Sequence, residues 1–445
     1  MRARTERGRA RTRRGRHGGG ARRTLPIGRG HGGLALAGAL LLAGGTGHVS
    51  LAHAAGAVVG SGTAASCTTN DATNPQDGPH GLTAAVAGGG TVTFDCGGDP
   101  VTITDNLTIS QNTTLDGSGQ QVTLDGGGNG SVITVNSGMR LALTDLTIAH
   151  GASLDGGGIF NLGAVTLTNS TVSGNSVGVS GASGAGAGIF NNGTVTLTNS
   201  TVSGNSTGFQ GGGGGIFNND GGTVTLTNST VSGNSTGLDN SVTGGGGIDN
   251  LGTVTLTNST VSGNSAPDGV GGGIFNEGGT VTLRNTILAG NSASTDPDCS
   301  GTLTSDDYNL IQDTTGCAIV GTTTHDITGQ DPHLGPLANN GGPTQTMADD
   351  TPATVTHPAV DAGSCVDQNG TAISTDQRGY TRPDDGEAAC DIGAYESGAS
   401  APVPPPPPGT ATPELGSGEL LATGLLPLGA VLLYRRRRLR RAAQQ

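Results

Sequence analysis

The chain has 445 residues, of which 84 are glycine and 2% are aromatic, and it contains no tryptophan. So few large side chains exclude a conventional globular core, although a repeating β-structure needs only a thin one. Residues 55–424 hold 33 acidic residues against four arginines, a net charge of −29 (4 − 33), which excludes nucleic acid as a partner. We predict no cofactor, with loose binding of Ca²⁺ to the acidic surface as the alternative.

Residues 1–54 have the features of an export signal peptide. An arginine-rich stretch up to Arg29 precedes an apolar run at 34–43, and Ala52-His53-Ala54 fits a small-x-small cleavage site. The pair Arg22-Arg23 resembles a twin-arginine signal, so both that route and the general secretory route stay open. We therefore expect an exported protein, in which disulfides are permitted.

Residues 55–99 are predicted to form an N-terminal cap, with 91–94 as the first strand beneath it. A near-verbatim repeat follows within residues 100–297. The sequence T-V-T-L-T-N-S-T-V-S-G-N-S occupies residues 194–206, 223–235 and 253–265, and relaxed copies begin at Ala164 and Thr280. A further, diverged copy covers 140–151. The repeat places five valines in register at steps of 27 to 30 residues: Val165, Val195, Val224, Val254 and Val281. A fixed period of this size is typical of stacked, solenoid-like units.

Each repeat contains three short strands separated by turns. Valine and leucine alternate with threonine in the first strand, Thr-Val forms the second, and an Ile-Phe pair marks the third in most copies. Three strands per period predict that each strand pairs with its equivalent one coil away, at about 4.8 Å. The predicted fold is therefore all-β: a single-stranded right-handed parallel β-helix (solenoid) with a disulfide-containing C-terminal capping module.

Asparagine recurs at two turns of every repeat. A turn asparagine tolerates the left-handed backbone, and stacked amide side chains can hydrogen-bond from coil to coil. We predict a structural ladder at the first turn, formed by Asn169, Asn199, Asn228, Asn258 and Asn285. The second series is Asn175, Asn205, Asn234, Asn264 and Asn291. The alternative is that the triplet N-S-T is a glycosylation acceptor.

Four glycine-rich segments of different length fall at the same point of the period, and we expect them to line one edge of the rod. They are residues 177–188, 207–215, 236–247 and 266–273. Insertions on one face of a solenoid often form its binding face. The alternative is that they are flexible loops without a partner.

From residue 298 to residue 398 the repeat gives way to a segment dense in proline and turns. Its motifs are D-P-H-L-G-P-L-A-N-N-G-G-P-T-Q-T at 331–346, D-Q-R-G at 376–379 and C-D-I-G-A-Y-E at 390–396. Together they resemble the choice-of-anchor Q domain family. The resemblance implies an exported bacterial surface protein of the pectate-lyase-like superfold and implies no activity. Because the end of a β-helix exposes unpaired strands, we expect this module to cap it.

Six cysteines allow fifteen pairings. We predict disulfides between neighbours in the sequence, because each neighbouring pair brackets one local unit. No C-x-x-C spacing is present, which argues against metal ligation. The predicted pairs are Cys67–Cys96, Cys299–Cys317 and Cys365–Cys390.

The last 47 residues have the order of a surface anchor. A proline-rich spacer at 399–419 precedes an anchor tail at 420–445, which holds an apolar stretch and six arginines. Its start resembles the sortase signal L-P-x-T-G, with leucine in place of proline: Leu420, Leu421, Ala422, Thr423 and Gly424. The resemblance implies cleavage after Thr423 and attachment to the cell wall. The alternative is a membrane tail stopped by the arginines, and both place the protein at the cell surface.

We expect a non-catalytic scaffold or adhesin-like protein that is anchored at the surface of a bacterium and displays its glycine-rich loops. Its partners would be the cell wall or membrane through the tail, and extracellular carbohydrate or protein. We predict no catalytic, cofactor-binding or metal-binding residues. The alternative is a polysaccharide lyase or glycoside hydrolase, for which the early coils supply few candidates: Asp116, Asp125, Asp145, Asp155 and Arg140.

Overall fold

The computed structural model describes residues 56–69, 77–178, 184–208, 211–237, 244–349, 355–384 and 388–401. All of them belong to one compact unit. The predicted export signal and the predicted sorting signal at 420–424 lie outside the described residues. Among the described residues, no helix is both long enough and apolar enough to cross a membrane.

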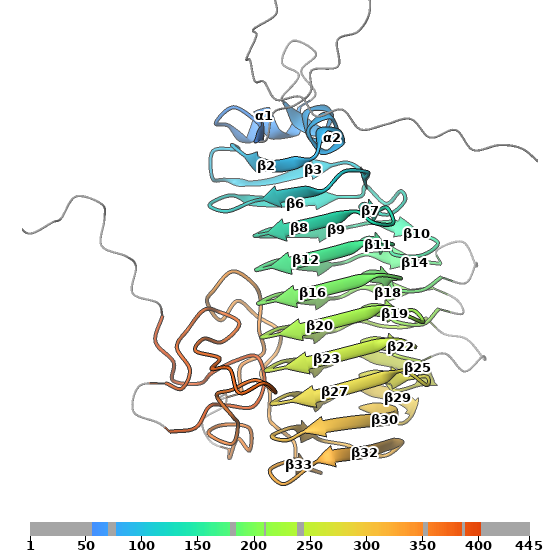
Figure 1. The fold of residues 1–445 in the computed structure, drawn as a ribbon, viewed down its shortest axis with the longest axis vertical. Coiled ribbons are helices and arrows are strands. Elements are labelled where there is room, and N and C mark those ends of the chain that lie inside the picture. The colour runs from blue at the N-terminus through green and yellow to red at the C-terminus, as the bar shows by residue number, and fades with distance from the viewer. Residues whose placement is uncertain are drawn as a thin grey trace, which may run out of the picture. The chain divides into compact units, whose positions relative to one another are not determined.

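The described chain winds into a parallel β-helix, as the repeat predicts (Figure 1). Successive coils contribute equivalent strands to three stacks. Stack A holds the T-V-T-L-T strands: β1 (Ala57–Val59), β2 (Gly90–Phe94), β5 (Thr113–Asp116), β8 (Arg140–Thr144), β12 (Ala164–Thr168), β16 (Thr194–Thr198), β20 (Thr223–Thr227), β23 (Thr253–Thr257), β27 (Thr280–Arg284), β30 (Cys299–Asp306) and β32 (Cys317–Thr322).

Stack B holds the Thr-Val strands: β3 (Pro100–Thr104), β6 (Gln121–Asp125), β9 (Leu146–Ala149), β13 (Thr171–Ser173), β17 (Thr201–Ser203), β21 (Thr230–Ser232), β24 (Thr260–Ser262), β28 (Ile287–Ala289), β31 (Leu310–Ile311) and β33 (Ile327–Thr328). Stack C holds the Ile-Phe strands: β4 (Leu107–Ile109), β7 (Ile133–Val135), β11 (Ile159–Asn161), β15 (Ile189–Asn191), β19 (Ile216–Asn218), β22 (Ile248–Asn250) and β26 (Ile274–Asn276). The long strand β30 pairs with both β26 and β27 and so joins stacks A and C.

Short pairings at the glycine-rich edge add a fourth element to some coils. They involve β10 (Ala152–Ser153), β14 (Ser176–Val177) and β18 (Ser206–Thr207), and separately β25 (Ser265–Val270) with β29 (Ser292–Thr295).

The core is a set of aliphatic columns, one residue wide. The five repeat valines pair in register along stack A, and each is at most 1% exposed: Val165, Val195, Val224, Val254 and Val281. The period of two along a strand points every second side chain inward, so the valine and leucine of T-V-T-L-T are buried while the threonines face out. The predicted valine column is confirmed.

Two helices cover the N-terminal end of the core, which the sequence pattern did not predict. They are α1 (Ala64–Thr68) and α2 (Gly78–Gly88). Leu82 and Val86 of α2 are at most 2% exposed and join the same apolar cluster as the first strands. Cys67 is bonded to Cys96, with Cα atoms 5.6 Å apart, so the cap is tied to the first coil.

Residues 299–328, which we had assigned to the C-terminal module, form the last coils of the rod as β30 to β33. The described chain after β33, called the module from here on, lies against the side of the rod and does not cover its end, contrary to our expectation (Figure 1). Its hydrogen bonds reach four successive coils, through Thr201, Thr230, Thr260 and Asn285. The first three of these, on stack B, are at most 2% exposed. The module docks here because the outward threonine hydroxyls of stack B match its amides and carbonyls.

The terminal coil is left open by this arrangement. The side chains of β32, on the last coil, are half-buried or exposed, and Val320 is 48% exposed. The disulfide Cys299–Cys317 links β32 to β30, and Cys365–Cys390 closes a loop within the module.

Candidate functional site

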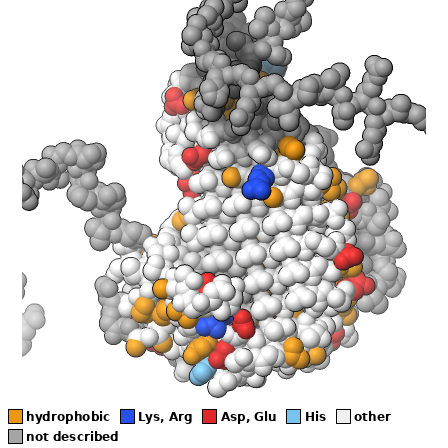
Figure 2. Space-filling view, viewed as in Figure 1, with side chains coloured by type: hydrophobic (Ala, Val, Ile, Leu, Met, Phe, Trp, Pro, Cys, Tyr) orange, Lys and Arg blue, Asp and Glu red, His pale blue; other side chains and the backbone are white. Residues whose placement is uncertain are grey.

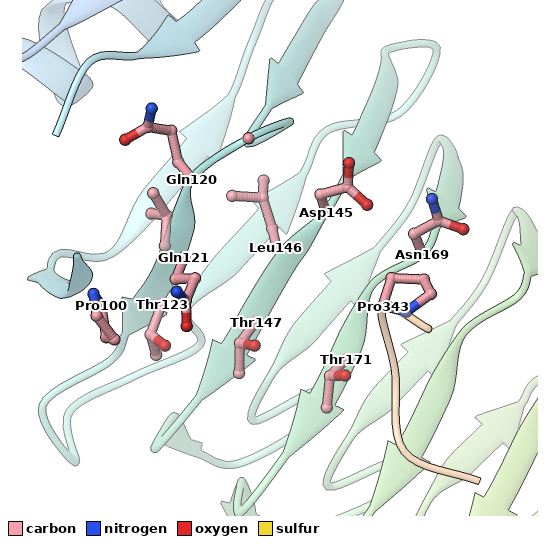
Figure 3. A pocket seen from close by; sticks show the side chains of 12 residues that line it. Pro100, Gln120, Gln121, Thr123, Asp145, Leu146, Thr147, Asn169, Thr171 and Pro343 are labelled. Atoms are coloured by element: carbon pink, nitrogen blue, oxygen red, sulfur yellow. The ribbon is translucent and has the colours of Figure 1, made fainter. Parts of the chain in front are cut away.

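A polar groove lies on stack B, just beyond the edge of the C-terminal module. It has a volume of about 400 Å³ and runs across β6, β9 and β13. Figure 3 shows side chains of the three strands side by side, with Pro343 of the module opposite Asn169. Its polar lining consists of Gln120, Gln121, Thr123, Asp145, Thr147, Asn169 and Thr171.

Strand register aligns the floor of the groove. Thr123 pairs with Thr147, and Thr147 pairs with Thr171. All three face outward because they alternate with buried residues such as Val122 and Val172. The next threonine of the column, Thr201, already lies beneath the module. The groove is therefore the uncovered continuation of the surface to which the module docks.

One carboxylate stands at the rim. Asp145 has φ +53 and occupies the turn position that asparagine takes in the later coils. Its Oδ2 accepts a hydrogen bond from the hydroxyl of Ser118 at 3.1 Å. Ser118 also donates its backbone N–H to Asp116 at 3.0 Å. Hydrogen bonds from the side chain and backbone of Ser118 lower the pKa of Asp116, so this neighbouring carboxyl is ionised at neutral pH.

The other acidic candidates from the sequence do not converge on the groove. Asp125 accepts a hydrogen bond from His150 Nδ1 at 2.7 Å, and Asp155 accepts one from the backbone of Ala185 at 2.9 Å. Arg140 lines a different hollow, on the outer face of stack A. Within the described ranges, no group of three or more histidine, cysteine, aspartate or glutamate residues is placed to hold a metal ion.

The groove can therefore offer neutral hydrogen-bond donors and acceptors and a single acid. Hydrolysis of a glycosidic bond uses two carboxyl groups roughly 5–10 Å apart, one as acid and one as base or nucleophile. Asp145 is the only acid that lines this groove. Hydroxyl and amide groups on adjacent strands are suited to binding the hydroxyls of a neutral carbohydrate.

A second cleft, of about 480 Å³, lies where the last coils meet the module. There Asp307 Oδ2 accepts a hydrogen bond from His325 Nδ1 at 2.7 Å, and its Oδ1 accepts one from the backbone of the same histidine. Burial alone would raise the pKa of Asp307, but the hydrogen bonds from His325 and Tyr308 outweigh it and lower that pKa. The Tyr308 ring stacks on the imidazole at 4.4 Å.

The pair of Asp307 and His325 was missed by the sequence analysis, although the sequence carries a signal for it. Because Leu310 pairs with Ile287, Tyr308 takes the turn position at which the repeat has asparagine, and Asp307 precedes it. The carbonyl of Asp307 accepts the backbone N–H of Asn285, as the carbonyl of Thr198 does for Asn169. Asp307 and Tyr308 both have positive φ, +77 and +61. Ser364 lines the same cleft, but its hydroxyl accepts hydrogen bonds from Arg284 Nη2 and the backbone of Val366. These contacts fix the position of the Ser364 hydroxyl in the wall of the cleft.

The five asparagines of the predicted ladder all have φ between +47 and +52, as a tight left-handed turn requires. Within this series, Asn199 Nδ2 donates to Asn169 Oδ1 at 3.3 Å, whereas Asn228 and Asn285 donate to carbonyls of the C-terminal module. Continuous amide ladders, with bonds of 2.7 to 2.9 Å, run instead inside the coils. They are Asn161, Asn191, Asn218, Asn250 and Asn276, and Asn175, Asn205, Asn234, Asn264 and Asn291.

No protein-family model and no curated protein matches this chain. Among solved structures, the chain is similar to the pectate lyase Pel9A at 13% sequence identity and a TM-score of 0.38. The alignment covers 78% of this chain and 98% of that one. The resemblance to the choice-of-anchor Q family stays a prediction from the sequence motifs.

Proposed function

We propose that the protein is a non-catalytic, adhesin-like scaffold, exported and held at the cell surface by its C-terminal tail. The observation that carries this proposal is the lack of charge on the outward strand faces of the repeat coils. In β16, β20 and β23 every outward residue of stack A is threonine. An enzyme site needs charged groups that differ from coil to coil, whereas these coils are nearly identical.

The position of the glycine-rich segments supports display as the role. Each one connects the edge beyond stack B to the isoleucine that begins the next strand of stack C, for example Ile189 and Ile216. Segment length changes from coil to coil while the pairing register of the stacks does not. The solenoid can therefore vary this edge without disturbing its core.

A polysaccharide lyase or hydrolase is the competing function, and its best location is the groove with Asp145. The test is to incubate the purified protein with uronate-containing and neutral polysaccharides, with and without calcium. We expect no unsaturated and no new reducing ends. Product formation that disappears in an Asp145→Ala variant would refute the scaffold role, and an Asp155→Ala variant serves as the matched control outside the groove.

Surface attachment is tested separately, by deleting residues 420–445. We expect the truncated protein to move from the cell fraction to the medium. A Thr423→Ala variant distinguishes the two anchoring routes, because it would abolish sortase cleavage but leave a membrane tail intact. Retention of the truncated protein on cells would show that the tail is not the anchor.

A further inference from the structure

The outer face of stack A is a two-dimensional array of threonines. Five consecutive strands, β12, β16, β20, β23 and β27, each present three outward positions. Thirteen of these fifteen positions are threonine, and the exceptions are Ala164 and Arg284 at two corners. The array consists of Thr166, Thr168, Thr194, Thr196, Thr198, Thr223, Thr225, Thr227, Thr253, Thr255, Thr257, Thr280 and Thr282.

The array repeats regularly in both directions. Thr196 pairs with Thr166 on one side and Thr225 on the other, and the same register continues to Thr255 and Thr282. Neighbouring strands are about 4.8 Å apart, and alternate residues of one strand are about 6.6–6.8 Å apart. Because threonine is branched at Cβ and stiff at χ1, identical neighbours favour the same orientation of hydroxyl and methyl groups.

Most of this face is open to solvent and carries no charge. Figure 2 shows an uncharged expanse over β12 to β23, with acidic side chains gathered toward its margins. Arg284 is the one charged outward residue of the five strands. The C-terminal module reaches only the edge of the array, where Thr257 donates a hydrogen bond to Gln368 Oε1 at 3.1 Å.

We infer that this threonine face binds ice. The inference rests on the proposed role as a non-catalytic surface adhesin and names the partner of one of its faces. A complementary partner must be uncharged, must offer hydrogen-bonding groups, and must repeat in two directions at the spacings of the array. A soluble polysaccharide repeats along one direction only, and a globular protein surface does not repeat.

Hexagonal ice meets all three conditions. The strand spacing lies close to its shorter lattice repeat, and the spacing of alternate threonines lies somewhat below its longer one. Each threonine of the array other than Thr257, which is buried against the module, presents a hydroxyl that can join the water lattice and a methyl group around which water orders. The absence of charge fits the same partner, because a charged side chain orients water around itself in a geometry that ice does not contain.

The experiment measures how much protein a slowly growing, polycrystalline ice body takes up from solution. The purified full-length protein is labelled, partitioned between ice and liquid, and compared with a reference protein that ice excludes. We expect uptake at least about tenfold above the reference, an effect equivalent to about 1.4 kcal/mol. The array variant is Thr196→Tyr, Thr225→Tyr, Thr255→Tyr, which interrupts the middle column and should reduce uptake to the reference level.

The groove supplies a matched control variant: Thr123→Tyr, Thr147→Tyr, Thr171→Tyr. These threonines are also outward, half-buried and in register on three adjacent strands, but they lie on stack B. We expect this variant to keep wild-type uptake. Circular dichroism and melting temperature verify that both variants are folded, since tyrosine is well tolerated in strands.

Exclusion of the wild-type protein from ice, or equal loss in both variants, would overturn the inference. Binding to crystalline chitin or cellulose through the same face, without uptake into ice, would overturn it as well. Cleavage of a polysaccharide would refute the proposed scaffold role but would leave the ice result readable, so the two failures are distinguishable.

Discussion

Asp249 interrupts a row of phenylalanines on the outside of stack C. Phe160, Phe190 and Phe217 stack with ring centroids 5.1 and 5.4 Å apart. In register, Asp249 then pairs with Phe217 on one side and Phe275 on the other. It is only 5% exposed, and its Oδ1 has no hydrogen-bond partner. Burial, with repulsion from Glu277, raises the pKa of Asp249 well above its ordinary value.

The carboxyl of Asp249 should make the free energy of unfolding decrease as the pH rises. Below the ordinary aspartate pKa, both the folded and unfolded states hold the proton, and Asp249 has no effect. Above it, the unfolded state loses the proton while the folded state keeps it, so folding becomes less favourable by up to about 1.4 kcal/mol per pH unit until the raised pKa is reached. An Asp249→Asn variant should lose this slope, as measured by denaturant unfolding at several values between pH 4 and 8.

A second substitution at the same position is the control. Asp249→Phe restores the residue of the other coils and should be more stable than wild type at neutral pH, because it removes the buried acid and extends the ring stack. If the wild type and the asparagine variant show parallel pH profiles, Asp249 is not the source of the dependence.

Replacing an asparagine of the amide ladder inside the coils by alanine should reduce the free energy of unfolding unusually strongly. Asn218 accepts a hydrogen bond from Asn191 at 2.8 Å and donates one to Asn250 at 2.8 Å, and all three are fully buried. Asn218→Ala removes both ladder bonds and the bonds from its amide to the carbonyls of Gly222 and Thr253. Each lost intramolecular hydrogen bond costs about 0.5–1.5 kcal/mol. We expect a loss of about 2–5 kcal/mol in the free energy of unfolding.

The half-buried asparagine Asn219 is the matched control, because its amide donates to Asn192 at 3.2 Å in an exposed contact outside the coils. Asn219→Ala should cost less than about 0.5 kcal/mol, as surface substitutions usually do. Equal losses at the two positions would show that the ladder contributes no more than any surface contact.

At the scale of elements, the strands could be predicted from the sequence because their cause is local. The alternation of Val195 and Leu197 with threonine sets one face inward, and its repetition at a fixed period sets the pairing partner. Helix α2 could not be predicted in this way. Its sequence, G-P-H-G-L-T-A-A-V-A-G, has glycine at three positions, which disfavours a helix. Burial of Leu82 and Val86 over the open core stabilises it instead.

Neither the groove nor the position of the module could be predicted from the sequence pattern, for a different reason. Gln377 donates to Thr201 Oγ1 and accepts from Thr230 Oγ1, contacts between residues 176 and 147 positions apart. No local pattern encodes such a pairing. Because Pro343 of the module forms one wall of the groove, the groove was not predictable either. Asp145 was among the sequence candidates only because it is one of the few acids in the early coils.

The module itself depends on charges buried in its interior. Arg382 and Glu396 form an ion pair at 2.9 Å with at most 2% of either side chain exposed. Arg382→Met would leave the carboxyl of Glu396 buried without its partner, which typically costs about 3–5 kcal/mol. We therefore expect the module to open, detected as faster proteolysis within residues 355–401.

The double variant Arg382→Met, Glu396→Leu removes both charges and provides the comparison. Replacing a buried ion pair by apolar residues is often neutral or stabilising, so much of the resistance to proteolysis should return. A double variant as sensitive as the single one would mean that the hydrogen bonds of Arg382 to the carbonyls of Asp391 and Gly393 hold the module, and not the ion pair.

At the scale of the whole molecule, the contacts of the module follow the spacing of the coils. It contacts equivalent residues of successive coils, such as Thr201, Thr230 and Thr260, which lie one strand spacing apart. The chain enters the module after the last coil, so the module is positioned from that end. Because the coils it covers are near copies, an added coil presents the same contacts again.

We therefore expect the protein to accept a duplicated coil beneath its module. A copy of residues 223–252 inserted before Thr253 should shift the first coils outward by one strand spacing, about 4.8 Å, while the module docks on the equivalent threonines. Hydrogen exchange within residues 355–401 should match wild type.

If the inserted counterpart of Thr230, which is fully buried in the wild type, is changed to lysine, the module should lose protection from hydrogen exchange. The same change in a copy of residues 164–193 inserted before Ala164, at the counterpart of the half-buried Thr171, should have no effect, because that coil lies beyond the module. Loss of protection in every insertion variant would show that the module recognises the particular coils, and not their repeat.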